Sequence, residues 1–327
     1  MSWTALGSDG TRRGTRFPSE PTLTTAPNKP PVLLRPHLPL PALRPALEER
    51  FELRSEPGPG ITAMVASGVV DAALMDSLPD LKLIALGTVG YDGVDLDHAR
   101  RRGISVTNTP DVLTDDVADL AVALILAVHR KLPRDDAHVR AGRWPVEGQP
   151  SLTRRFSGRR TGIVGLGRIG LAIAKRLEGF GGEIAYHARH PREDAPYRYA
   201  ATPEALAASV DVLVVATPGG ADTTKLIDHP VIDALGPEGV IVNIARGSVI
   251  DEEAMVSALV EGRLGGAGLD VFAQEPHVPE ALLAMDNVVL LPHQGSGTVE
   301  TRAAMAGLVV ANLDAFFAGK PLPTPIA

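Results

Sequence analysis

The sequence of 327 residues contains no cysteine, which excludes disulfides, thiolate nucleophiles and cysteine metal sites. Aromatic residues make up only 4% of it, so we expect a core of mainly Ala, Val, Leu and Ile. The longest clean apolar run, residues 120–128, is too short to span a bilayer. The net charge of -7 does not favour a role in binding nucleic acid or anionic membranes, which attract positively charged proteins.

What the sequence does contain is typical of a globular protein. Hydrophobic residues account for 44% and charged residues for 22%, and the length indicates about two domains. The first thirty residues differ, being rich in Ser, Thr, Pro, Gly and Arg without an apolar segment. They indicate a disordered extension over 1–31 rather than a secretory signal, with a transit peptide as the alternative. We therefore expect a cytoplasmic protein.

The first half of the sequence predicts a parallel α/β sheet. Short apolar runs at 32–34, 62–66, 83–86 and 105–107 read as strands, and 45–53 and 71–78 read as helices. Residues 111–130 are apolar on nearly all sides after Val117, which is typical of a helix buried between domains or in a dimer interface. The polar stretch 134–160 then reads as a linker into a new domain.

The second half predicts a doubly wound nucleotide-binding sheet. Six strands are expected at 161–164, 183–186, 212–216, 240–244, 267–271 and 288–291, with helices at 169–177, 203–208 and 251–261. The helix expected after Gln294 can pack back on the first domain. The fold class is thus α/β with two Rossmann-like domains. We expect a discontinuous substrate-binding domain, 32–107 plus 297–327, and a dinucleotide-binding domain, 108–296.

Residues 165–170 fit the dinucleotide motif G-x-G-x-x-G. The motif follows an apolar strand and opens a helix, so its glycines permit a tight turn and the helix offers free N–H groups to a pyrophosphate. The alternative is a structural glycine turn. About twenty residues on, His187, Arg189 and His190 stand where an NAD enzyme carries an acid. Arginine and histidine suit a 2′-phosphate, which predicts NADPH/NADP; a solvated basic patch is the alternative.

Three candidate catalytic residues follow successive predicted strands. Arg246 can grip a carboxylate or carbonyl oxygen, His293 can supply a proton, and Glu275 can favour the imidazolium. Asp270, near a strand end, is expected beside the nicotinamide. Taken singly, each would more often be structural, but together at one sheet edge they predict a ketone-reducing site. No spacing resembles a zinc site, and we expect no metal.

Other histidines are weaker candidates. His129 ends an apolar helix and is expected to act as a C-terminal cap, and His277 lies between prolines in an expected loop. The remaining candidates, His37, His98, His138 and His229, show no partner pattern.

With these residues in place, the sequence resembles the D-isomer-specific 2-hydroxyacid dehydrogenase family from about Val32 onward. The segments that carry the resemblance are VGYDGVDL (89–96), TNTPDVLTDDVADLA (107–121), GLGRIG (165–170), NIARGSVIDE (243–252), GGAGLDVFAQEP (265–276) and LLPHQGSGTVETR (290–302). Within the family, YHAR (186–189), LEGF (177–180) and LGPEGVIVNIARG (235–247) are most similar to hydroxyphenylpyruvate and glyoxylate/hydroxypyruvate reductases.

The resemblance implies residue roles and a homodimer with the 111–130 helix in its interface. Substrate binding is implied for the N–H groups of Val89 and Gly90 and for Arg246 and His293, and acid/base partnership for Glu275. The implied cofactor contacts are Leu166, Gly167, Arg168, Ile169, His187, Ala188, Arg189, His190, Thr217, Pro218, Ile244, Ala245, Arg246, Asp270 and Gly295. Gln294 departs from the family's usual small apolar residue after the histidine. The N-terminal extension has no recognised counterpart.

The function predicted is NADPH-dependent reduction of glyoxylate, hydroxypyruvate or an aryl-pyruvate to the D-2-hydroxy acid. Two alternatives remain open. One is NADP-dependent oxidation of another small anion such as phosphite. The other is a non-catalytic, dinucleotide-sensing protein similar to the corepressor branch of the family.

Overall fold

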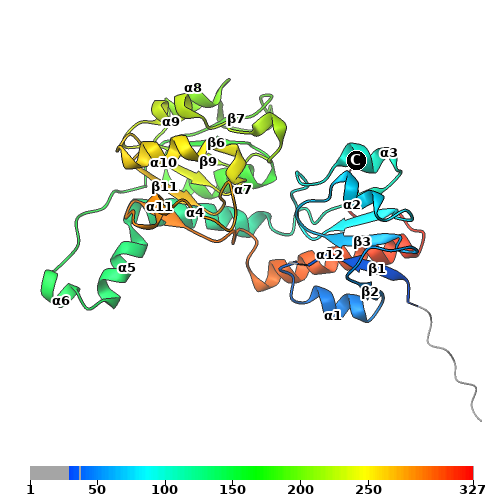
Figure 1. Cartoon of the computed structure of the whole chain (residues 1–327). Coiled ribbons are helices and arrows are strands. Elements are labelled where there is room, and N and C mark those ends of the chain that lie inside the picture. The colour runs from blue at the N-terminus through cyan, green and yellow to red at the C-terminus, as the bar shows by residue number, and fades with distance from the viewer. Residues whose placement is uncertain (1–28, 37, 327) are drawn as a thin grey trace, which may run out of the picture.

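The computed structural model describes residues 29–36 and 38–326, and the predictions for 1–28 and His37 fall outside these residues. The described strands form one five-stranded and one seven-stranded sheet, in which all neighbouring strands are parallel. Each sheet with its helices makes one α/β domain, and the two lie side by side (Figure 1). The predicted fold class is confirmed.

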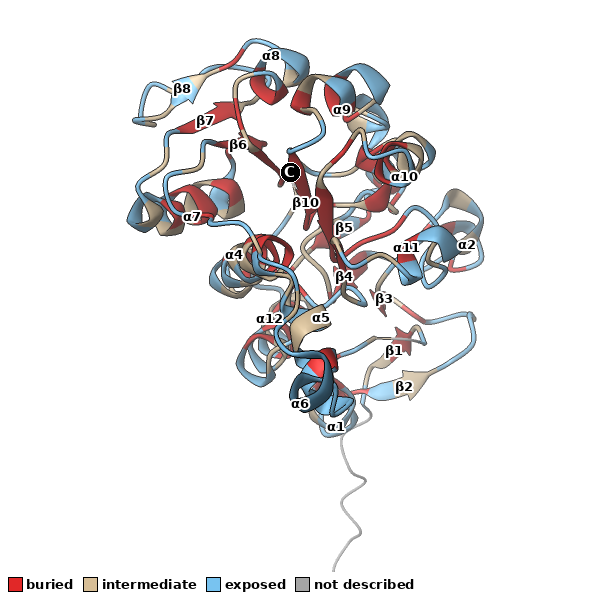
Figure 2. Ribbon diagram, turned by 90° about the vertical axis from the view of Figure 1, so that its left-hand side faces the viewer, coloured by how far each residue is buried: buried red, intermediate tan, exposed pale blue. Residues whose placement is uncertain are grey.

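The first sheet has the order β2-β1-β3-β4-β5. Its strands are β1 (Pro31–Leu34), β2 (Glu52–Arg54), β3 (Ala63–Ala66), β4 (Leu83–Leu86) and β5 (Ser105–Thr107), and its connecting helices are α1 (Leu43–Glu48), α2 (Ala72–Asp76) and α3 (Leu96–Arg101). Residues of β3 and β4 are all buried, as their unbroken apolar runs predict, whereas the edge strand β2 is partly exposed (Figure 2).

One helix of this domain ends earlier than predicted, and another is confirmed to within two residues. The helix expected over 45–53 ends at Glu48, because Glu52 and Leu53 pair with β1 as the edge strand β2. The helix expected from Asp71 begins at Ala72, since the Asp71 carboxylate instead caps it by accepting from the Leu74 N–H. Regular structure begins at Pro31, one residue before the predicted start.

The second sheet has the order β12-β11-β10-β9-β6-β7-β8. Its strands are β6 (Thr161–Val164), β7 (Ile184–His187), β8 (Arg198–Tyr199), β9 (Val212–Val215), β10 (Val240–Asn243), β11 (Gly266–Leu269) and β12 (Val288–Leu290). Helices and turns around it are α7 (Arg168–Leu177), η1 (Glu178–Phe180), α8 (Pro203–Ala207), η2 (Ala221–Thr223), α9 (His229–Leu235), η3 (Gly247–Val249), α10 (Glu252–Val260) and α11 (Glu280–Leu283). The six predicted strands are confirmed to within two residues. The strand order reverses between β6 and β9, which places a ligand crevice at their carboxyl ends.

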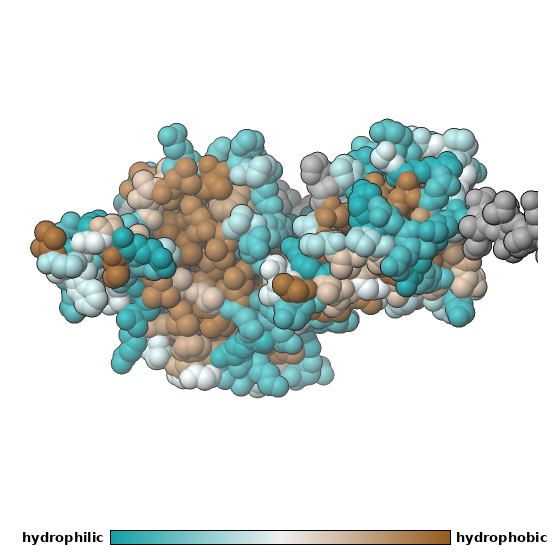
Figure 3. Space-filling model, turned by 90° about the horizontal axis from the view of Figure 1, so that it is seen from below, coloured by the Kyte–Doolittle hydropathy of each residue, from teal (hydrophilic) through white to brown (hydrophobic). Residues whose placement is uncertain are grey.

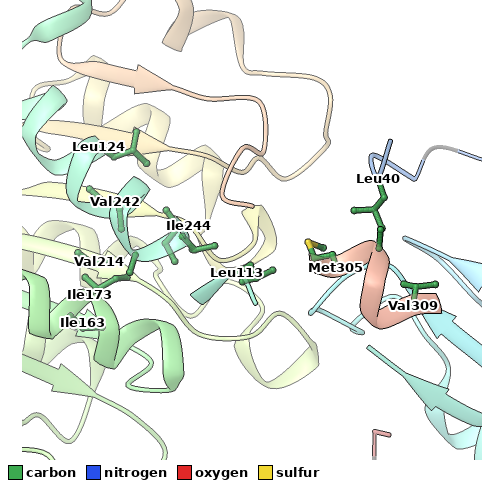
Figure 4. Close-up of a cluster of buried hydrophobic side chains, with 14 of the residues drawn as sticks. Leu40, Leu113, Leu124, Ile163, Ile173, Val214, Val242, Ile244, Met305 and Val309 are labelled. Atoms are coloured by element: carbon green, nitrogen blue, oxygen red, sulfur yellow. The ribbon is translucent and has the colours of Figure 1, made fainter. Parts of the chain in front are cut away.

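Two long helices cross between the domains. The chain leaves β5 into α4 (Thr114–Arg130), which packs on α7 and on β10 and β11 of the second sheet. It returns from β12 into α12 (Val299–Phe317), which packs on α1 and β4 of the first sheet. One apolar cluster runs through both domains, with Leu113 between Ile244 on one side and Met305 on the other (Figure 4).

The stretch predicted as a linker is not a plain linker. It contains α5 (Leu132–Arg140) and α6 (Trp144–Glu147), which project from the second domain (Figure 1). Lys131, in the left-handed conformation with φ 48°, ends α4 and starts α5, so a sharp bend separates the apolar helix α4 from the polar helix α5. The exact domain boundaries remain a prediction.

No helix among the described residues is both long and apolar enough to cross a membrane.

Candidate active site

The predicted site residues lie in loops at the carboxyl ends of parallel strands. The glycine turn follows β6, the Arg189 loop follows β7, and Arg246 follows β10. Asp270 and Glu275 follow β11, and His293 follows β12. Because all these strands are parallel neighbours in one sheet, the loops share one edge.

The glycine turn between β6 and α7 leaves room for a phosphate group. Gly165 has φ 96°, and a Cβ there would lie 2.7 Å from the Thr217 nitrogen. A Cβ at Gly170 would lie 2.0 Å from the Gly165 oxygen, so the first turn of α7 is in direct backbone contact with the glycine turn. Gly167, the N-cap of α7, has open space where its Cβ would be. This cradle beside the free N–H groups of the helix fits a dinucleotide pyrophosphate.

The loop after β7 presents its basic side chains to solvent. Arg189 and His190 are exposed, whereas the His187 Nδ1–H donates to the Ala200 carbonyl at 3.0 Å. His187 is therefore held by the backbone, with one ring nitrogen already used. No carboxylate among the described residues forms an ion pair with Arg189 within 4.0 Å, which leaves its guanidinium open to an anionic ligand.

Arg192, which the sequence analysis did not single out, fastens this loop to the glycine turn. Its Nη1 donates to the Leu166 carbonyl at 2.8 Å, and its Nε donates to Asp194 at 2.9 Å. Its backbone N–H donates to the buried Tyr186 hydroxyl at 2.7 Å. The sequence shows that Arg192 lies only three residues beyond Arg189, which marks it as part of the same basic loop. Its contact with Leu166, however, is visible only in the folded chain.

His293 and Glu275 form a close pair. The Nδ1–H of His293 donates to Glu275 Oε2 at 2.8 Å, which leaves Nε2 for another partner. The second carboxylate oxygen accepts from the Phe272 N–H at 3.1 Å. Burial acts to raise the pKa of Glu275, but the hydrogen bond and charge of His293 outweigh it and leave the pKa below its ordinary value. The carboxylate is therefore ionised at neutral pH.

Asp270 anchors the loop that carries His293. Its buried carboxylate accepts from the N–H groups of Gln294 at 2.6 Å and Gly295 at 2.8 Å, and its carbonyl accepts from the His293 N–H at 2.9 Å. Burial raises the pKa of Asp270, while these N–H groups lower it in part. His293 has φ 55°, a left-handed conformation that this anchoring supports.

Arg246 reaches the other domain. The buried Asn243 shapes its turn by donating to the Arg246 carbonyl and accepting from the Ala245 N–H, both at 3.0 Å. The Arg246 guanidinium lies against Gly90, where a Cβ would come within 1.7 Å of Nη2. Its Nε also pairs with Asp92 at 3.3 Å, a residue that the sequence analysis did not assign.

The structure thus brings Arg246 to Gly90, Glu275 to His293, and Asp270 to Gly295. The backbone of Thr217 contacts Gly165, and the Leu166 carbonyl accepts a hydrogen bond from Arg192. Four of the histidines set aside have structural partners: His98 pairs with Asp76, His129 with the Ile125 carbonyl, His138 with the Gly148 carbonyl, and His229 with Asp233. Among the described residues, no group of three or more His, Asp or Glu is arranged to hold a metal ion.

Comparison with known proteins points to one family. The family model described as "D-isomer specific 2-hydroxyacid dehydrogenase, NAD binding domain" matches residues 122–295. A hydroxyphenylpyruvate reductase of Plectranthus scutellarioides is 54% identical over 282 residues, 86% of this chain and 90% of that protein. A glyoxylate/hydroxypyruvate reductase of Arabidopsis thaliana is 55% identical over 261 residues, 80% and 83% of the two chains.

A solved structure is also similar. The NADPH-dependent glyoxylate/hydroxypyruvate reductase of Sinorhizobium meliloti, in complex with NADP and malonate, is 47% identical with a TM-score of 0.88. The similarity covers 91% of this chain and 97% of that one.

Proposed function

This chain belongs to the D-isomer-specific 2-hydroxyacid dehydrogenase family, and we propose that it reduces a 2-oxo acid to the D-2-hydroxy acid with NADPH. The observation that carries the proposal is the 2.8 Å hydrogen bond between His293 and Glu275 at the sheet edge that also carries Arg246. These groups supply a proton donor, its charge partner and a carbonyl-binding cation.

The proposed chemistry gives each side chain of the site a defined role. NADPH, when bound at the glycine turn and the Arg189 loop, would supply the hydride for the carbonyl carbon. As the C=O double bond becomes single, its oxygen takes a proton from Nε2 of protonated His293, while Glu275 holds Nδ1 and stabilises the imidazolium. Arg246 polarises the carbonyl oxygen and orients the acid group, and the N–H groups of Val89 and Gly90 hold the same carboxylate.

The cofactor assignment rests on the loop after β7. The exposed Arg189 and His190 suit a 2′-phosphate, and β7 ends in His187 without the carboxylate that would bind a ribose hydroxyl. The similar Sinorhizobium meliloti enzyme was solved with NADP, which supports NADPH for this chain. The adjoining cradle at Gly167 accepts the pyrophosphate, and Thr217, Pro218, Ile244 and Ala245 stand at the same edge.

The proposed substrates are glyoxylate, hydroxypyruvate or an aryl-pyruvate. Relatives named for glyoxylate, hydroxypyruvate and hydroxyphenylpyruvate support this range. The intact His293–Glu275 pair disfavours a purely nucleotide-sensing role, because binding alone needs no paired acid/base. Oxidation of another small anion remains the second candidate for the same site.

We further propose that a second copy of this chain covers the projecting arm formed by α5 and α6. Exposed apolar side chains gather along this arm and just beyond it: Leu132, Val139, Trp144, Val146 and Leu152. A broad apolar surface of the same domain lies beside the arm (Figure 3). In a two-fold dimer each arm can lie over the partner's apolar surface, so both are buried by one symmetric contact.

The catalytic assignment is tested by His293→Ala. Loss of the general acid should lower kcat with glyoxylate or hydroxypyruvate by about two to four orders of magnitude. The dissociation constant for NADPH should stay unchanged. His277→Ala is the matched control, because this exposed histidine lies in the same region without a side-chain partner in the described residues. A His293 variant that retained most of its turnover would refute the assignment.

A further inference from the structure

Asp92 makes a contact between the domains that the proposed reaction does not use. It lies between β4 and α3 in the first domain, and its Oδ1 is 3.3 Å from Nε of Arg246 in the second. Both side chains are about one-third exposed, at 32% each. The pair is thus reachable by a dissolved anion.

Three loops converge on this ion pair. A Cβ at Gly219, in the loop after β9, would lie 2.8 Å from Arg246 Cγ and 3.1 Å from Asp92 Oδ2. A Cβ at Gly90 would lie 1.7 Å from Arg246 Nη2 and 2.9 Å from Asp92 Oδ1. The two glycines therefore let the carboxylate of Asp92 and the guanidinium of Arg246 meet at the backbone of residue 90.

That meeting point coincides with the proposed position of the substrate carboxylate. The substrate acid group is assigned to the N–H groups of Val89 and Gly90 and to Arg246, so its charge has to lie close to the Asp92 carboxylate. Two carboxylates beside one guanidinium repel each other and compete for its N–H donors. The Nη1 of Arg246 is already donating to the Ala245 carbonyl at 2.7 Å, which reduces the donors left for both.

We propose that Asp92 is a specificity-determining residue that stands in for the substrate carboxylate on Arg246 when no substrate is bound. An incoming 2-oxo acid has to displace this internal carboxylate, so Asp92 raises the KM of every acid that has to bind Arg246. It also prevents small inorganic anions from occupying Arg246. This inference rests on the proposed function for the identity of the ligand, but the competition itself is a binding property.

The test compares the wild-type chain with Asp92→Asn, using oxamate as a non-reacting analogue of a 2-oxo acid. Oxamate is titrated calorimetrically into the protein saturated with NADPH. Removal of the competing charge should lower the oxamate dissociation constant by about three- to tenfold, as expected for a partly exposed ion pair. The KM of glyoxylate should fall in parallel. Asp92→Ser serves as a second variant, and a thermal melt checks that both are folded.

Asp97→Asn is the matched control. Asp97 lies in the same segment, is 78% exposed and pairs with Arg100, so its loss removes the same charge without touching Arg246. This control should bind oxamate as the wild type does. Unchanged or weaker oxamate binding in folded Asp92 variants, or tighter binding in the control as well, would overturn the inference. Oxamate binding without turnover of any 2-oxo acid would instead refute the proposed function alone.

Discussion

The carboxylates of Asp270 and Glu275, which both follow β11, have different hydrogen-bond partners and therefore different roles. Both oxygens of buried Asp270 accept backbone N–H groups, which fixes the loop under His293. Glu275 is more exposed and shares its oxygens between the Phe272 N–H and the His293 ring. We expected Asp270 beside the nicotinamide; its contacts make it a positioning residue for the His293 loop, and a cofactor contact stays a prediction.

Arg189→Ala tests the cofactor assignment. Removing the guanidinium takes away the charge-assisted contact with the 2′-phosphate, so the KM of NADPH should rise by about tenfold or more. The KM of NADH should change little, because NADH lacks that phosphate. Steady-state kinetics with one 2-oxo acid measure both KM values, and the KM of NADH serves as the control for the KM of NADPH. Equal losses with both cofactors would show that Arg189 supports the loop instead of the phosphate.

His129 gives the fold a pH dependence. Burial lowers its pKa, and its Nδ1–H donates to the Ile125 carbonyl at 2.8 Å within α4. The folded state therefore takes up the proton less readily than the unfolded chain, whose histidine pKa is about 6.5. The resulting stability is present above about pH 6.5 and is lost as the pH falls through and below it.

Thermal melting between pH 8 and pH 5.5 measures this effect. The melting temperature of the wild type should fall more over this range than that of His129→Gln, which keeps a donor for the Ile125 carbonyl but cannot titrate. Identical falls in the two proteins would assign the pH dependence to other groups.

At the scale of elements, the sequence predicts best where apolar runs are unbroken. The strands β4 and β6 lie where the sequence predicts them, because all their residues are buried and mostly apolar, which leaves a pattern independent of context. The edge strands β2 and β8 carry no such run and exist because β1 and β7 offer unpaired backbone groups. Helices α3 and α9 were also not predicted; each begins at a capping aspartate, Asp95 and Asp228, and this signal was available.

For the candidate site, too, some residues could be predicted from the sequence and others could not. The sequence pattern predicted Arg246, Glu275 and His293 because each lies in a segment that follows a strand, and their catalytic roles stay a prediction. The roles of Asp92 and Arg192 were not visible, because their partners Arg246 and Leu166 are distant in sequence and meet only in the folded chain.

Asp116 clamps the two crossing helices together. Its carboxylate, on α4, accepts from the hydroxyls of Thr298 and Thr301 at the start of α12, and these bonds lower the pKa of Asp116. Asp116→Ala removes the charged acceptor of both hydroxyls and leaves Thr301 only the Val112 carbonyl at 3.1 Å, which should destabilise the fold by about 1–3 kcal/mol. Calorimetric melting should show this loss, whereas Asp119→Ala, on the exposed side of α4, should melt close to the wild type.

At the scale of the whole molecule, the arm predicts a dimer. Sedimentation of the wild type should give twice the chain mass of 34.4 kDa. The double variant Val139→Glu, Val146→Glu places charges on the arm and should sediment as a monomer. Val260→Glu, at an exposed residue of α10, controls for added charge alone. A monomeric wild type would contradict the proposed assembly.

The central claim is that the two domains together reduce a 2-oxo acid with NADPH. The most direct measurement is the loss of NADPH absorbance with glyoxylate, hydroxypyruvate, pyruvate, phenylpyruvate and 4-hydroxyphenylpyruvate, repeated with NADH. We predict turnover of at least one of these acids, with NADPH clearly preferred over NADH. No turnover of any of them by protein that still binds NADPH would contradict the claim.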